Sequence, residues 1–153
     1  MIIDVRAMQD SDAKDFECVN ASLELPGGYD ATLLAVEACV RLTNIRGSII
    51  AKGGLVAALK LVCCRCLEPV ALELKLEFSE KFLKLAVSSC YPSAEKEAVT
   101  EDEYVFDGET LDISRAVRDN IILNIPPKTV CNDACKGLCQ ACGCNLNNET
   151  CSC

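Results

Sequence analysis

Apolar and polar residues alternate in three stretches between residues 34 and 82. Alternation with a period of two is typical of a strand that buries one of its faces. Turn signals separate the stretches, at Arg46–Ser48, at Gly53-Gly54 and at the cysteines after Leu61. The pattern therefore predicts an antiparallel β-meander. The apolar positions expected on its buried face are Leu34, Val36, Ala38, Val40, Leu42, Leu55, Ala57, Leu59, Leu61, Val70, Leu72, Leu74, Leu76, Phe78 and Phe82.

A helical pattern follows the strands. Asp112 can cap a helix near residues 112–122, and Pro126-Pro127 ends it. The sequence also predicts a short strand at IIDV near the start and a polar loop over residues 11–30 that closes with Pro26, Gly27 and Gly28. An acidic connection is expected over residues 91–110, with a short strand at 104–106. We therefore expect an α+β fold, with an antiparallel sheet and one or two packed helices in a body of residues 1–130. The helix stripe expected to face the sheet is Ile113, Ala116, Val117 and Ile121.

Composition excludes much ordinary enzyme chemistry. The chain has 153 residues, of which 50% are hydrophobic and none is histidine, so histidine bases, Ser-His-Asp triads and HExxH metal sites are absent. It has no phosphate loop and no G-x-G-x-x-G motif, and we expect no enzyme activity and no nucleotide cofactor. The N-terminus carries acids where a signal peptide is basic, and no stretch reaches the length of a membrane span, so the expectation is a cytoplasmic protein without a membrane partner.

The 13 cysteines are the most informative feature of the composition. A cytoplasmic chain keeps its thiols reduced unless a metal binds them, so we prefer metal binding to a secreted disulfide framework. The spacings suggest two tetrahedral sites of four thiolates each. The first predicted set is Cys63, Cys66, Cys131 and Cys135, and the second is Cys139, Cys142, Cys151 and Cys153.

Several alternatives remain open at this stage. Cys144 can replace a member of the second set, because it forms C-x-C with Cys142. Zinc, as one or two ions, is favoured over iron-sulfur because the tail matches neither common ferredoxin spacing. Closed four-thiolate zinc is structural, since it leaves no position for water or substrate. Cys18, Cys39 and Cys90 are expected to be ordinary thiols, and Cys64 a bystander.

Charge is unevenly distributed along the chain, whose formal net charge is -8. Residues 95–109 hold seven acids and one base, whereas residues 33–84 hold eight bases against five acids. A charge run usually marks a solvated segment, but the second stretch leaves room for a basic face on the sheet.

Three segments match a known family in order and separation: CCRCLEPV (63–70), LDISRAVRDNIILNIP (111–126) and CNDACKGLCQACGCNLNNETCSC (131–153). Together they resemble the YceD family, which is linked to accumulation of large-subunit ribosomal RNA. The resemblance implies a non-enzymatic factor whose partners are ribosomal RNA or large-subunit assembly intermediates, with a ribosomal protein as an alternative. Cys64 and Cys144 depart from the family pattern. The matching positions are Cys63, Arg65, Cys66 and Leu67, then Cys135–Cys139, Cys142, Gly143, Asn145–Asn147, Cys151 and Cys153.

Two basic residues are candidate contacts with RNA or phosphate. Arg65 lies between the hairpin cysteines and Lys136 follows Cys135, and each can either contact a phosphate or bind nearby carbonyl groups. We expect residues 131–153 to form a zinc-ribbon-like tail packed on the 63–66 hairpin. Two alternatives to an RNA-associated zinc protein are a protein-interaction adaptor without RNA contact and a thiol or metal redox protein.

Overall fold

The computed structural model describes residues 1–20, 23–25, 31–85 and 103–153, and the side chains of residues 17–20 are not among the described features. This part of the chain is mostly β, with one helix. The elements are β1 (Ile2–Asp4), β2 (Ala13–Asn20), β3 (Ala31–Ile45), β4 (Ser48–Val62), β5 (Pro69–Lys84), β6 (Tyr104–Phe106), β7 (Thr110–Asp112) and α1 (Ser114–Asn124).

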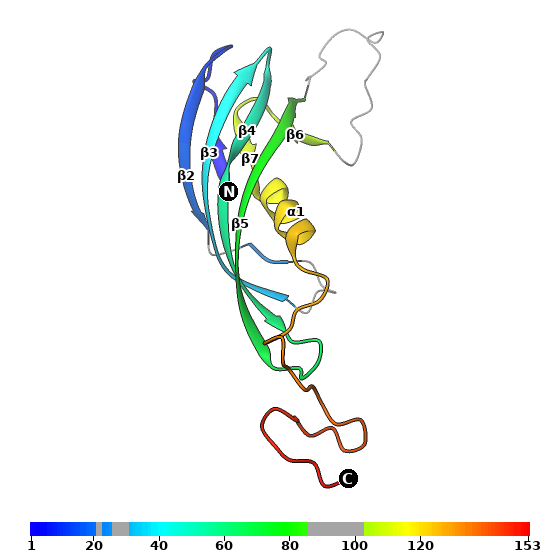
Figure 1. Cartoon of the computed structure of the whole chain (residues 1–153). Coiled ribbons are helices and arrows are strands. Elements are labelled where there is room, and N and C mark those ends of the chain that lie inside the picture. Colours follow the sequence, from blue (N-terminus) through cyan, green and yellow to red (C-terminus); the bar gives the residue numbers. More distant parts are fainter. Residues whose placement is uncertain (21–22, 26–30, 86–102) are drawn as a thin grey trace, which may run out of the picture.

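A curved sheet with the strand order β2-β3-β4-β5-β6 forms the body. The ladders from β2 to β5 are antiparallel, and only the short β6 runs parallel to its neighbour β5. Strands β1 and β7 form a separate antiparallel pair. Figure 1 shows α1 beside the sheet and the cysteine-rich tail beyond the end at which a loop joins β4 to β5.

The hydrophobic core lies between α1 and one face of the sheet. Buried side chains alternate along β3 and β4, as the period-two pattern predicts. On α1, Ala116, Val117 and Ile121 are fully buried in the same core, as is Ile113 just before the helix. Each fully buried leucine, isoleucine or phenylalanine stabilises the fold by about 1.5–3 kcal/mol relative to exposure. The body thus has a core of its own, apart from the cysteines.

The prediction of a hairpin turn at Gly53-Gly54 is wrong. Strand β4 continues through both glycines, and its ladder with β3 pairs Gly53 with Val40 and Gly54 with Cys39. The turn between β3 and β4 lies instead at Arg46-Gly47, the other site that the sequence indicated. Both residues have positive φ, 52° and 80°, as a tight two-residue hairpin turn requires.

The expected burial of Leu34 is also wrong. The ladder between β3 and β4 shifts register between Leu33 and Ala35, and Leu34 is 56% exposed. A bulge places an extra residue in one strand, so residues before and after it alternate out of phase. Leu33 packs against the core in place of its neighbour.

The helix begins close to the predicted position. Ile113 occupies the N-cap position without a side-chain cap, but Asp112 Oδ1 accepts a hydrogen bond from the Ser114 N–H at 2.9 Å. One unpaired N–H of the first turn is thereby satisfied. The helix ends at Asn124, before Pro126-Pro127, as predicted. Within the described ranges, no helix is both long and apolar enough to cross a bilayer.

Some sequence predictions lie outside the described residues. These are residues 21–22 and 26–30 of the predicted N-terminal loop, most of the acidic connection, Cys90, and the side chain of Cys18. Within the described residues the loop prediction is wrong, because Ala13–Asn20 form β2 and pair with β3 at the edge of the sheet.

Candidate metal centre

The first cysteine cluster begins where β4 ends. Cys63 continues the buried face of β4 and is 0% exposed. A tight loop follows, in which the Leu67 N–H donates to the Cys63 carbonyl and the Cys63 N–H to that of Glu68. Leu67 adopts a φ of 61°, a conformation that a leucine rarely takes. This loop brings the sulfurs of Cys63 and Cys66 to the same side of the chain.

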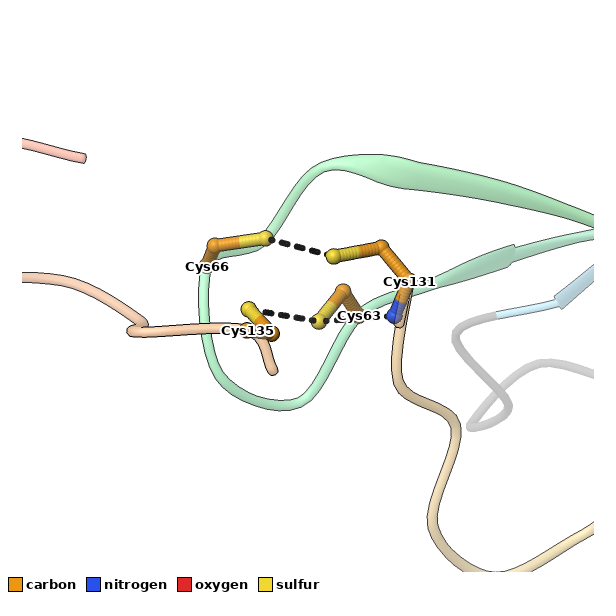
Figure 2. A group of neighbouring side chains, drawn as sticks. All are labelled: Cys63, Cys66, Cys131 and Cys135. Carbon is orange, nitrogen blue, oxygen red and sulfur yellow. Dashed lines mark hydrogen bonds between the residues drawn. The ribbon is translucent and has the colours of Figure 1, made fainter. Parts of the chain in front are cut away.

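The tail brings two further thiols to this loop. Figure 2 shows Cys131 and Cys135 facing Cys63 and Cys66 across a small space. The Sγ–Sγ distance is 3.9 Å for Cys63 and Cys135 and 3.7 Å for Cys66 and Cys131, and all four sulfurs lie within 4.8 Å of one another. In tetrahedral zinc with Zn–S bonds of about 2.3 Å, sulfurs lie about 3.8 Å apart. The geometry fits a closed four-thiolate zinc site.

Polar contacts fasten the tail to the hairpin loop. Arg65 Nη1 donates to the carbonyls of Asp133 and Cys135 at 3.2 and 3.1 Å, and the Arg65 carbonyl accepts from the Leu138 N–H. Gly137 has a φ of 77°, and a Cβ at that position would lie 3.0 Å from the Arg65 carbonyl oxygen. The side chain of Arg65 therefore serves the carbonyl-binding role that the sequence left as one of two alternatives.

Hydrogen-bond donors around the first cluster favour thiolates at two of its positions. Backbone N–H groups, above all that of Cys66, lower the pKa of Cys63 to about 6, and the Asn147 side-chain amide lowers the pKa of Cys135. The pKa of Cys131 is raised to about 12, chiefly by its hydrogen bond with Cys135. Four closely placed thiols do not all ionise in the absence of a metal ion, because adjacent thiolates repel one another. A bound divalent cation offsets this repulsion.

The second cluster lies within the tail itself. The sulfurs of Cys139, Cys142, Cys151 and Cys153 all lie within 4.8 Å of one another. Cys151 Sγ is 3.3 Å from that of Cys139 and 3.6 Å from that of Cys142. Gly143, at a φ of 76°, closes the turn that brings Cys139 and Cys142 together, and its N–H donates to the Cys139 carbonyl. Both predicted sets of four thus converge, and their metal ligation stays a prediction.

The four sulfurs of the second cluster that lie within 4.8 Å of one another do not include that of Cys144. Its pKa is raised to about 12, first by a hydrogen bond with Cys142 and also by one with Cys151. The second cluster is more exposed than the first, and Cys144 interacts with two of its members. Cys144 therefore remains an alternative ligand there.

Acidification should release metal from these clusters. Binding needs thiolates, and the pKa values of Cys63 and Cys142, about 6 each, lie below the ordinary value of 9.0. The stabilisation that a thiolate gains from a lowered pKa is complete at pH values above the ordinary pKa, and it is lost as the pH falls through the lowered pKa. We expect the apparent zinc affinity, measured by chelator competition, to fall steeply between about pH 7 and pH 5. An affinity that does not change with pH would contradict thiolate ligation.

Sequence reasoning missed two features near the first cluster. Asn147 donates from its side-chain amide to Cys135 Sγ at 3.4 Å and accepts from the Lys136 N–H at 2.8 Å. A cleft of about 420 Å³ lies beside the hairpin loop, and exposed Leu67 is one of the residues that line it. The other residues that line it include Leu61, Val62, Cys64, Ile122, Ile125, Pro126 and Pro127. The position of Asn147 within the tail motif was the only signal for either feature.

The family comparison agrees with the motifs. The family model described as large ribosomal RNA subunit accumulation protein YceD matches residues 51–153, which include the C-terminal half of the sheet, α1 and both clusters. The chain belongs to the YceD family. The resemblance found in the sequence motifs is thereby confirmed.

Curated relatives extend the match toward the N-terminus. A maize protein named large ribosomal RNA subunit accumulation protein YCED homolog 1, chloroplastic, is 28% identical over 92% of this chain and 55% of its own length. The Arabidopsis thaliana protein of the same name is 44% identical over 35% of this chain and 17% of its own length. An uncharacterized Mycobacterium tuberculosis protein is 29% identical over 72% of this chain and 51% of its own length. This chain spans about half the length of the maize and mycobacterial relatives. No solved structure matches it.

Proposed function

We propose that this chain is a non-enzymatic, cytoplasmic zinc-binding factor that acts in ribosomal RNA accumulation or large-subunit assembly. Family membership supports the link to large-subunit RNA, and the family name speaks of accumulation, not of catalysis. The observation that carries the metal role is the convergence of Cys63 and Cys66 with Cys131 and Cys135, thiols from distant parts of the sequence. Zinc there would act structurally and hold a zinc-ribbon-like tail against an antiparallel β-meander.

The proposed zinc role can be tested by elemental analysis of protein purified without added metal, combined with thiol titration before and after chelation. Close to two zinc ions per chain, with the eight clustered thiols protected, is the expected result. Iron with visible absorbance, or no metal, would contradict structural zinc and favour the thiol redox alternative.

Direct RNA contact is less well supported for the face of the sheet that carries Arg41 and Lys75 than it is for the tail. Arg41 is paired with Asp15 at 2.7 Å and Lys75 with Glu73 at 2.9 Å, so part of the positive charge that the sequence placed on this face is neutralised. Lys136 lies on the tail and is exposed. Its hydrogen bond to Asn147 is donated by the backbone N–H and does not involve the side-chain ammonium group. We propose Lys136 as a phosphate contact.

Alanine substitutions at Lys136 and Arg65 should have different effects. For Lys136→Ala we expect a weaker affinity for ribosomal RNA fragments, with the salt-dependence slope reduced by about 1, because one phosphate contact is lost. Arg65→Ala should instead loosen the tail, since it removes the donor to the carbonyls of Asp133 and Cys135. The measurements are RNA titrations across salt concentrations and hydrogen exchange of the tail. Salt-independent binding, unchanged in Lys136→Ala, would argue against direct RNA contact.

The cleft beside the hairpin loop favours a second candidate, an adaptor whose partner is a protein. Leu67, one of the residues that line it, is 63% exposed. Exposed apolar groups around a cleft are typical of protein contacts. Binding to a large-subunit ribosomal protein that Leu67→Asp abolishes, without any RNA affinity, would support this candidate.

A further inference from the structure

Among the residues that the structure describes, strand β5 has one edge that is unpaired over most of its length. Its ladder with β4 runs from Pro69 to Phe82, whereas on the other side β6 pairs only with Phe82–Lys84. In the part of the chain that the structure describes, no other strand pairs with this edge, and Figure 1 shows β6 beyond β5 at one end only. The N–H and C=O groups along such an edge can pair with another strand.

The apolar row of β5 beside this edge is incompletely covered. Leu72, Leu74 and Leu76 are only partly buried. Their cross-strand partners on β4, Leu59, Ala57 and Leu55, are at most 2% exposed. This difference in burial between β5 and β4 arises on the side of the open edge. A further strand there would bring apolar neighbours to the same face of the sheet.

The other face of β5 carries charges of alternating sign. Glu73, Lys75 and Glu77 are exposed at successive positions of this face. Lys75 Nζ lies 2.9 Å from Glu73 Oε1, and the two side chains are 74% and 60% exposed. A strand with this order of charges is complementary to an antiparallel copy of itself, because opposite charges then face each other.

We propose that the open edge of β5 pairs with β5 of a second copy of this chain, giving a two-fold symmetric dimer with a continuous sheet. With the two-fold axis at Leu74, each Glu73 faces the Lys75 of the other copy, and each Leu72 faces Leu76. Such self-complementarity is what an isologous interface requires. The partly exposed leucines meet on one face and the alternating charges on the other.

Backbone geometry is compatible with this register. The Leu85 N–H donates to the Phe106 carbonyl on β6, so the N–H groups of odd-numbered β5 residues point toward the open edge. Glu73 and Lys75 are therefore the residues that exchange backbone hydrogen bonds between copies. The paired segment, residues 69–79, ends before Glu80, whose carboxylate accepts from Asn120 of α1. The paired segment therefore includes neither this contact nor any cysteine.

Sedimentation velocity of the full chain in reducing buffer, over roughly 1–100 µM, tests the proposal. We expect a concentration-dependent dimer for the natural chain and a dissociation constant raised at least about tenfold by Lys75→Glu, because unlike charges become like charges at two symmetric pairs. The double variant Glu73→Lys/Lys75→Glu restores the pairing and should restore the dimer. Lys14→Glu makes the same charge change on β2, at the opposite edge of the sheet, and should leave the dimer unchanged.

Three outcomes would overturn the proposal. A monomer throughout this concentration range excludes it directly. A dimer that Lys75→Glu leaves intact uses another surface. If the edge of β5 gains protection from hydrogen exchange only when ribosomal proteins are added, it binds a ribosomal protein and not a second copy of this chain. The result does not depend on zinc content, so the proposed metal function can fail while the dimer stands.

Discussion

Replacing Cys135 with serine is expected to remove the metal ion of the first cluster and release the tail from the hairpin loop. Bound zinc should fall from close to two ions per chain to one, since three thiolates bind zinc far more weakly than four. The buried residues that form a separate group around the site are Cys63, Cys66 and Cys135, with Val70, Val130 and Leu138 packed against them. So few apolar contacts do not hold a tail in place without the metal.

The size of this effect follows from what structural zinc contributes. In small zinc domains the binding free energy is about 10–16 kcal/mol, and most of it is folding free energy. We expect rapid protease cleavage in residues 128–153 of Cys135→Ser and a small change in the unfolding of the body, which has its own core. Elemental analysis, limited proteolysis and thermal unfolding measure the three effects separately.

The matched control is Cys39→Ser. Cys39 is exposed on β3 and belongs to neither cluster, so this variant should keep both ions and a protected tail. If Cys135→Ser retained the zinc content and protease resistance of Cys39→Ser, the first cluster would not be a metal site.

The two four-thiol sets could be predicted from the sequence because their decisive information is local. A C-x-x-C segment brings two sulfurs together through a single turn, whatever the rest of the fold. The need for four ligands then links Cys63 and Cys66 to the tail. The cleft and the Asn147 contact could not be predicted, since both depend on how α1 and the tail meet the hairpin loop.

Strands β3, β4 and β5 were predictable from alternation, whereas β2 was predicted as a polar loop and β7 was not predicted. The errors within β3 and β4 have local causes. Residues 34 and 35 carry no signal for a bulge, so the alternation was continued through it and Leu34 was placed in the core. Adjacent glycines are found in turns, and they are also found where two backbones approach closely. The sequence of Gly53-Gly54 does not distinguish these two uses, whereas the ladder between β3 and β4 does.

Substituting Gly53 with alanine is therefore expected to destabilise the body strongly. A Cβ at Gly53 would lie 2.0 Å from the Cys39 carbonyl oxygen and 2.9 Å from Val40 Cα, both backbone atoms of β3. Backbone atoms in a ladder cannot turn aside as a flexible side chain can, so the strands must separate. We expect a loss of about 2–4 kcal/mol in the free energy of unfolding, or roughly 5–15 °C in Tm.

The neighbouring glycine provides the control for this prediction. At Gly54 the nearest atom to an added Cβ is the Leu76 carbonyl oxygen at 3.8 Å, an ordinary contact. Gly54→Ala should be at least as stable as the natural chain, because alanine in a strand loses less conformational entropy on folding than glycine. Thermal unfolding of both variants decides the matter. Equal Tm values would show that the two backbones do not approach closely at Gly53, and an unchanged zinc content in Gly53→Ala would show that the body and the metal centre are stabilised separately.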